Sequence, residues 1–496
     1  MSLREFEAYL LYDRTSSEYL IFRAGRLMQQ YCVDQWAKCE QERLRYIELN
    51  QLQYRLETLH GLADALRSES VEVHRVVADE EARRRRIGDR TEQVRASRGE
   101  STELDADEIG RKIIIPPKFT EGPRYIYQRF LDSMAIVRET GAPSLFITMT
   151  CNPHWPEIKD NLRRGQTASD RPSDRPDIVA TVFMQKLKEL NKDLDEGLLE
   201  IQAARVHVVE NQKRGLPHAH ILLILRPEDT PTSAEDVDKI VSAKLSDKEK
   251  HPELYATVIS SMSHGPCGRQ NPRSPCMKNG RCSKKFPKPL SEETSMTADN
   301  YPTYRRRRRP EGFLNHKGKV WDNATINQWI VPYNAFLSQK YNCHISVEVC
   351  ATNKAIKYIY KYVYKGSDMT TITIDGQDNE IQQYLLGRYI SPVEACNRLF
   401  MHPTQGSTHS VVNLPIHLEN MNMVAYRGLA STAHLHNLIY RGNPEGTADL
   451  LYKDAPTKKR WHNNQREPYK KYVVSLSRIV HVSPQDPLIL PKASTQ

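Results

Sequence analysis

The chain has 496 residues, of which 39% are hydrophobic, and a formal net charge of +10 at pH 7. This length allows large hydrophobic cores and predicts two to four folded units. The positive charge favours a polyanionic partner, because basic residues also form runs at 83–86, 305–309 and 458–460. Runs of this kind also occur as solvated loops, so that alternative stays open for each.

The same composition excludes two classes of protein. No apolar run of about 18 residues and no secretory signal pattern occurs, which predicts a soluble intracellular protein with no membrane partner. Nine cysteines in a chain of this length argue against a disulfide scaffold. We therefore expect free thiols or metal ligands.

The first half of the chain has three parts with different residue patterns. Residues 1–70 carry apolar side chains at helical spacing and predict a helical N-terminal module, and residues 71–110 read as a charged linker. Residues 111–229 then predict a helix at 125–140, a strand at 144–153, a helix at 179–198 and a β-hairpin. This order is typical of an α+β fold with an antiparallel sheet.

The hairpin carries the first candidate site. Two β-rich runs flank a turn that contains Gly215. Alternation along a strand places His218 and His220 on one face. Antiparallel pairing across the turn would set Glu210 opposite His218 and Val208 opposite His220, so that a carboxylate joins the two imidazoles.

A site built from Glu210, His218 and His220 suits a divalent ion such as Mg²⁺ or Mn²⁺, because it leaves coordination positions open for a substrate oxygen. Ordinary strand histidines with hydrogen-bond partners remain an alternative. Metal-dependent amidohydrolases also begin with His-x-His on a strand. However, the sequence lacks the ordered series of later ligand-bearing strands that their barrel requires.

Residues 230–330 predict a Cys/His-rich basic insert that begins with a polar helical stretch. Its candidate ligands for a structural Zn²⁺ are His264, Cys267, Cys276 and Cys282. Residues 264–310 are too poor in apolar side chains to form a core, so a metal would order them. Reduced thiols without a metal remain the alternative. The insert ends in candidate DNA contacts, which are Arg305, Arg306, Arg307, Arg308 and Arg309.

Residues 331–370 combine a second β-rich run at 344–349 with a tyrosine-rich segment at 352–366. Read as a helix, this segment places Tyr358 and Tyr362 one turn apart. The phenols would lie beside a row of three cations, which are Lys357, Lys361 and Lys365. This arrangement suits a phosphate, although an amphipathic helix with surface tyrosines would give the same pattern. Residues 371–496 form a C-terminal region.

Three ordered motifs resemble a known family. They are Phe-Ile-Thr-Met-Thr-Cys-Asn-Pro at 146–153, Gly-Leu-Pro-His-Ala-His-Ile-Leu at 215–222 and Lys-Tyr-Ile-Tyr-Lys-Tyr-Val-Tyr-Lys-Gly at 357–366. Together they resemble the replication-initiator (Rep) domain of Helitron transposases, which are HUH endonucleases. The similarity extends to segments around residues 23–31, 264–288 and 387–395.

The resemblance implies an antiparallel HUH endonuclease core with flanking helices. In that family the residues that match His218 and His220 bind the catalytic metal, and those that match Tyr358 and Tyr362 are paired nucleophiles. Glu210 as third ligand rests on the hairpin geometry. The implied activity is nicking and strand transfer on single-stranded DNA at transposon ends, through a 5′-phosphotyrosine, in the nucleus.

One departure from the family concerns the helicase. Helitron proteins usually continue into a helicase, but this sequence holds no Gly-x-x-x-x-Gly-Lys-Ser/Thr phosphate loop. We therefore expect any helicase to be supplied separately. The main alternative function is a catalytically inactive, transposon-derived protein that binds nucleic acid through its zinc segment and basic runs.

Overall fold

A computed structural model gives the structure of this chain. It describes residues 1–12, 20–51, 114–168, 173–211, 215–296, 302–316, 318–350, 381, 384–385, 390–416, 459–462, 465–468 and 472–479. The chain divides into two compact units. The first comprises residues 1–43, 126–371 and 387–409, and the second comprises residues 44–125, 372–386 and 410–496.

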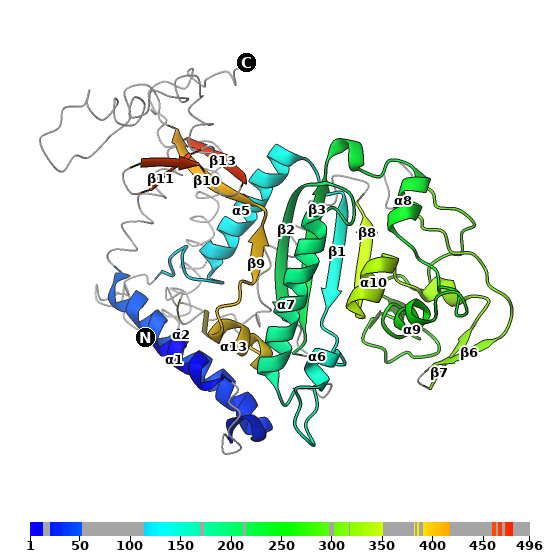
Figure 1. Ribbon diagram of the computed structural model, residues 1–496, viewed down its shortest axis with the longest axis horizontal. Coiled ribbons are helices and arrows are strands. Elements are labelled where there is room, and N and C mark those ends of the chain that lie inside the picture. The colour runs from blue at the N-terminus through cyan, green and yellow to red at the C-terminus, as the bar shows by residue number, and fades with distance from the viewer. Residues whose placement is uncertain are drawn as a thin grey trace, which may run out of the picture. The chain divides into compact units, whose positions relative to one another are not determined.

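A five-stranded sheet forms the centre of the first unit (Figure 1). Its strand order is β8-β1-β3-β2-β9, and every neighbouring pair is antiparallel. The strands are β1 (Leu145–Thr150), β2 (Gln202–Asn211), β3 (Pro217–Leu225), β8 (Ile345–Val349) and β9 (Gln405–Ser407). The hairpin strands β2 and β3 are adjacent, as the sequence predicts, and β3 is the central strand.

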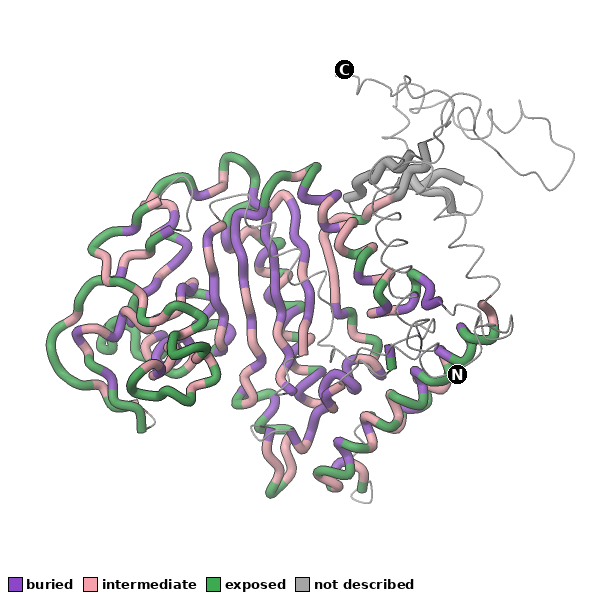
Figure 2. Tube along the Cα trace, turned by 180° about the vertical axis from the view of Figure 1, so that it is seen from behind, coloured by how far each residue is buried: buried purple, intermediate pink, exposed green. Residues whose placement is uncertain are grey.

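One face of this sheet packs against α7 (Pro176–Asp195). The helix begins at Pro176. Proline fits this position because the first N–H groups of a helix have no hydrogen-bond partner within the helix. Its apolar stripe includes Val179, Phe183, Leu187 and Leu190, which share a core with Ile147 and Ile221 of the sheet. Figure 2 shows the strands as largely buried. Successive side chains of a strand point to opposite faces. Because one set is buried in this core, the alternate set projects from the other face of the sheet.

Further helices of the first unit are short. The helix α13 (Pro392–Leu399) packs against α7, and α1 (Leu3–Leu10) contacts α13. The others are α6 (Pro156–Lys159), α8 (Ala234–Ile240), α9 (Pro252–Ser261) and α10 (Ala335–Tyr341). The helices α2 (Arg26–Leu49) and α5 (Pro123–Thr140) cross the boundary between the units. Within the described N-terminal residues, α1 and α2 are helical, and the module at 1–70 stays a prediction.

The polar stretch after the hairpin, expected to be helical, contains two short helices. It holds α8 and α9, separated by extended residues, and then the two hairpins β4 (Met277–Lys278) with β5 (Arg281–Cys282) and β6 (Phe313–His316) with β7 (Lys319–Asp322). A small core supports the insert. Its buried members include Leu254, Val258, Trp321 and Ile330, and none lies within residues 264–310.

The second unit has its own small core. Ile115 and Phe119 pack with Ile381 and Tyr384, and the Phe119 and Tyr384 rings meet edge to face at 5.4 Å. The side chain of Gln51 exchanges two hydrogen bonds with the backbone of Ile114, at 2.9 and 3.0 Å. Two strand pairs also occur, β10 (His409–Ile416) with β13 (Tyr472–Ile479) and β11 (Lys459–His462) with β12 (Gln465–Pro468). In the described residues, no helix is long and apolar enough to cross a membrane.

Arg306 has a structural position in the insert. Its side chain is 3% exposed, and its Nη1 donates to the carbonyl oxygens of Asn327 and Ile330 at 2.6 Å each and of Ala243 at 3.2 Å. Burial lowers the pKa of Arg306 to about 10, which still leaves it charged at neutral pH. The guanidinium therefore ties three backbone segments together.

Replacing Arg306 with Ala should lower the free energy of unfolding by about 3 kcal/mol or more, because buried carbonyl groups lose their donor. Arg308 is exposed, so Arg308→Ala should change that free energy by less than about 0.5 kcal/mol. Urea denaturation of both variants measures the difference. Equal stability of the two variants would contradict the structural role of Arg306.

Candidate active site and metal centre

The register of the hairpin confirms the pairing expected from the sequence. Glu210 pairs with His218 and Val208 pairs with His220 across β2 and β3. On the other side of β3, Thr150 pairs with His218 and Thr148 pairs with His220. Antiparallel partners project to the same face of a sheet, so one polar row runs Thr150, His218, Glu210. This row lies on the face opposite the α7 core.

The threonines of β1 hold both imidazoles. Thr150 Oγ1 lies 3.1 Å from His218 Nε2, and Thr148 Oγ1 lies 3.2 Å from His220 Nδ1. The two imidazole rings are 5.8 Å apart between centroids. A hydrogen bond at one ring nitrogen fixes the orientation and tautomer of the ring, as outer partners do in metal sites. The strand that the sequence predicts at 144–153 thus lies beside the hairpin as β1.

Glu210 approaches the second histidine. Its Oε2 lies 3.6 Å from His220 Nε2, and its other carboxylate oxygen is buried with no hydrogen-bond partner among the described residues. Phe146 stacks on His220, with the rings parallel within 6° and their centroids 5.6 Å apart. The carboxylate and the imidazole are thus held at an apolar boundary, where an ion or a phosphate would be partly shielded from water.

Burial keeps His218 neutral. Desolvation, with smaller contributions from the nearby His220 and His344, lowers the pKa of His218 to about 3. A neutral imidazole carries the lone pair that a metal ion requires. At neutral pH, His218 is therefore in the protonation state of a ligand.

His344 is a residue of this face that the sequence did not single out. Thr150 N donates to its backbone oxygen at 2.8 Å, which places it beside the polar row, just before β8. Its Nδ1 lies 2.8 Å from the carbonyl oxygen of Ser261, and burial lowers the pKa of His344. The period-two pattern of His344, Ser346 and Glu348 is the signal that would have shown it.

The ligand atoms of the predicted catalytic site, Glu210, His218 and His220, lie farther apart than those of the Cys/His cluster in the insert. In the described part of the chain, a single group of three or more His, Cys, Asp or Glu side chains brings its ligand atoms within 4.8 Å of one another. This group comprises His264, Cys267, Cys276 and Cys282, the four residues expected from the sequence. The cluster could hold a metal such as zinc.

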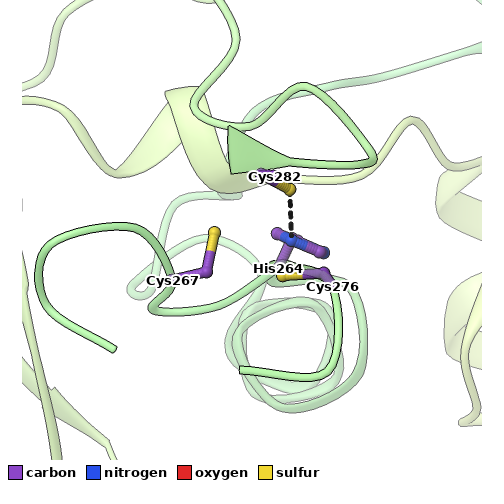
Figure 3. A group of neighbouring side chains, drawn as sticks. All are labelled: His264, Cys267, Cys276 and Cys282. Atoms are coloured by element: carbon purple, nitrogen blue, oxygen red, sulfur yellow. Dashed lines mark hydrogen bonds between the residues drawn. The ribbon is translucent and has the colours of Figure 1, made fainter. Parts of the chain in front are cut away.

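The cluster gathers four separate positions of the insert (Figure 3). His264 follows α9, Cys282 ends β5, and their Nε2 and Sγ atoms lie 3.4 Å apart. Phe286 stacks on the His264 ring at 4.3 Å, and His264 N donates to the carbonyl oxygen of Trp329 at 2.8 Å. Three sulfurs and one nitrogen form a soft ligand set, and tetrahedral zinc bonds of about 2.3 Å to sulfur fit ligand atoms this close.

The electrostatics of the cluster favour a thiolate at Cys282. Burial acts to raise its pKa, but the backbone N–H groups of Phe286 and Lys284, together with Cys276 and Cys267, lower it overall. Burial and the two other thiols raise the pKa of Cys267 to about 12. Once one of these packed thiols has ionised, formation of a second thiolate is unfavourable unless a cation is bound. This behaviour is typical of a metal site built from cysteines.

Gly265 allows the chain to approach this cluster. It has a φ of +102°, and a Cβ there would lie 3.1 Å from Cys267 N and 3.2 Å from the Trp329 ring. Only glycine combines this backbone conformation with so little space. The turn of His264-Gly-Pro-Cys267 is thus set by its glycine.

The remaining predicted site residues divide into three groups. Tyr358, Tyr362 and their lysines Lys357, Lys361 and Lys365 lie outside the described residues, as do Arg83 to Arg86. Arg305 forms an ion pair with Asp238 at 3.3 Å, Arg307 lies 3.5 Å from Glu292, and Arg309 donates to the carbonyl oxygen of Leu245 at 2.8 Å. Arg308 is exposed and makes no ion pair with any described residue.

The prediction that Arg306 contacts DNA is wrong. The side chain is buried and its donors are used by backbone carbonyls, so it cannot reach a phosphate. The hydroxyl of Tyr304, which precedes this run, accepts a hydrogen bond from Val349 N at 2.9 Å. Within the arginine run, Arg307 and Arg308 are the exposed positions, whereas Arg305 and Arg309 are half-buried.

Comparison with known protein families finds a match for the first part of the chain. Residues 6–223 match a family described as the Helitron helicase-like domain at the N-terminus. The matched range includes β1, β2 and most of β3, with Thr148, Thr150, Glu210, His218 and His220. No curated protein matches the chain.

The cluster should bind one zinc ion per chain in protein purified without a chelator, as measured by elemental analysis. Cys276→Ala should lose that zinc, because it removes one of four ligands. Cys350→Ala is the matched control, since Cys350 is a half-buried thiol outside the cluster. Wild-type protein without zinc, or equal zinc in both variants, would refute the assignment.

Protonation of His218 should destabilise the fold in acid. Its folded pKa of about 3 lies below the ordinary 6.5, so the unfolded chain binds this proton more readily. The stability that neutral His218 contributes is fully present above pH 6.5 and is lost as the pH falls towards 3, with a loss of about 2 kcal/mol at pH 5.

Denaturant unfolding between pH 5 and 8, without added divalent ion, measures this dependence. His218→Gln should flatten the slope, because glutamine does not titrate. His251 is exposed, so His251→Gln should retain the wild-type slope. An unchanged slope in His218→Gln would show that His218 titrates normally in the folded state.

Proposed function

We propose that this chain is a Helitron-type protein that nicks single-stranded DNA and transfers the strand through a tyrosine, because residues 6–223 match the Helitron helicase-like domain. One observation carries this proposal. His218 and His220 lie on one face of the central strand, with Glu210 opposite on β2 and Thr148 and Thr150 holding the rings from β1. Two imidazoles beside a carboxylate suit a divalent ion and a phosphate oxygen.

The chemistry proposed for this face is that of an HUH endonuclease. Bound Mg²⁺ or Mn²⁺ would supply Lewis acid polarisation of the scissile phosphate. The phenol oxygen of Tyr358 or Tyr362 forms a bond to phosphorus while the bond to the 3′ oxygen breaks. The phenol proton passes to solvent and the 3′ oxygen takes one up, which leaves a free 3′ hydroxyl and a 5′-phosphotyrosine.

The paired tyrosines rest on the sequence motif at 357–366. Two nucleophiles permit a second cleavage before the first covalent link is resolved, as strand transfer requires. Lys357, Lys361 and Lys365 of the same motif, with Arg307 and Arg308 of the insert, would bind the backbone phosphates. The partners would be transposon ends and a separately supplied helicase, and the site of action the nucleus.

A second candidate function is a catalytically inactive nucleic-acid-binding protein. The observation that favours it is the difference between the two sites. The His/Cys cluster brings its ligands within 4.8 Å, whereas Glu210, His218 and His220 do not meet that closely. The exposed arginines need no catalytic metal to bind DNA. Covalent adduct formation separates the two functions.

The test is incubation of the full chain with 3′- or internally labelled single-stranded DNA and Mg²⁺ or Mn²⁺, followed by denaturing electrophoresis. His218→Ala and His220→Ala should each reduce adduct formation by about a hundredfold or more, because charge on the phosphate is no longer neutralised. DNA binding should remain within about threefold of wild type, since it depends on Lys and Arg.

Tyrosine variants complete the test. The double variant Tyr358→Phe, Tyr362→Phe should bind DNA but give no adduct, because it lacks the attacking oxygens. Each single variant should keep part of the first cleavage, and Tyr360→Phe is the matched control that should keep it fully. An adduct in the double variant, or its loss in Tyr360→Phe alone, would assign the nucleophile elsewhere. Wild-type protein that binds DNA without an adduct would favour the binding function.

A further inference from the structure

A polar pocket lies where β1 ends. Its volume is about 820 Å³, within the range of sites that bind small organic groups. Four parts of the first unit form its walls: the turn after β1, the end of α6, one side of α9 and the C-terminal end of α10. The lining residues that matter here are Asn152, Lys159, Thr257, Ser260, Gln339 and Asn342.

Hydrogen bonds hold the walls of this pocket in place. Asn152 Nδ2 donates to the carbonyl oxygen of Asn342 at 2.6 Å, and Asn152 Oδ1 accepts from His154 N at 3.0 Å. Asn342 ends α10 in the left-handed conformation, with a φ of +40°, and its Oδ1 accepts from Thr257 Oγ1 at 3.3 Å. The pocket is therefore formed before any ligand arrives.

The chemistry of the lining suits a base better than a phosphate. Lys159 and Glu253 carry opposite charges, which cancel. Gln339 Nε2 donates to Glu253 at 2.9 Å, which leaves its Oε1 as an acceptor, and Asn342 Nδ2 is a donor. Amide and hydroxyl groups with balanced charge match the donors and acceptors on the edge of an unpaired nucleobase.

The pocket also lies next to the histidine face. Asn152 follows Thr150 by two residues, a chain length of about 7 Å, and Thr150 holds His218. Ser261 lines the pocket, and its carbonyl oxygen lies 2.8 Å from His344 Nδ1. A strand whose phosphate reaches His218 would pass the mouth of the pocket with a neighbouring nucleotide.

We propose that this pocket holds one unpaired base, one or two nucleotides from the scissile phosphate, and sets part of the target sequence. The inference rests on the proposed function for its substrate, single-stranded DNA. It adds the residues that read one base, chiefly Gln339 and Asn342. Neither residue belongs to the metal face or to the tyrosine motif.

The test is selection from a pool of randomised single-stranded oligonucleotides, bound to the full chain without divalent ion and then sequenced. Wild-type protein should enrich one base at one position by about tenfold, the discrimination of one good amide contact. Gln339→Ala and Asn342→Gly should each reduce that enrichment by about fivefold. Glycine retains the left-handed backbone at residue 342.

Gln185→Ala is the matched control, because Gln185 is an exposed helical glutamine outside the pocket. It should leave the enrichment unchanged, and total affinity should stay within about threefold in all variants. No base preference in wild type, or full preference in both pocket variants, would overturn the inference. A base preference without a covalent adduct would reject the proposed cleavage and leave the pocket assignment standing.

Discussion

Backbone pairing of three antiparallel strands is the constraint on which the candidate active site depends. The β2–β3 register sets Glu210 beside His218, and the β1–β3 register sets Thr150 and Thr148 beside the two histidines. A shift of one residue in either pair would turn these side chains into the α7 core. Burial of Ile147 and Ile221 on the other face therefore fixes the polar row.

The edge of the same sheet supports the insert. Tyr333 bridges to Ser346 of β8, and Ser263 bridges to Ile330, so backbone pairing continues from the sheet towards His264. Covering β8 in this way protects an edge strand from pairing with other chains. It also brings a buried Arg306, a small apolar core and the His/Cys cluster to one region. A metal in that cluster would therefore stabilise the insert where it packs beside β8 and His344.

The positive charge of the chain serves two purposes. Arg306 and Arg205 are buried and form hydrogen bonds with carbonyl or carboxylate oxygens, so they stabilise the fold rather than a complex with DNA. Arg308 is exposed, and Arg307 is largely so. Only exposed charge attracts a polyanion at long range. Net charge alone therefore overstates the surface that is available to DNA.

The sequence by itself determined the hairpin, its register, the face of His218 and His220, and the four members of the His/Cys cluster. These follow from local rules, namely alternation along strands and the clustering of soft ligands in an apolar-poor segment. Only the tertiary structure decided that Arg306 is buried and that α9 and α10 form a pocket beside β1. These depend on contacts between residues far apart in the chain, such as Arg306 with Ala243 and Thr257 with Asn342, which no periodicity in the sequence encodes.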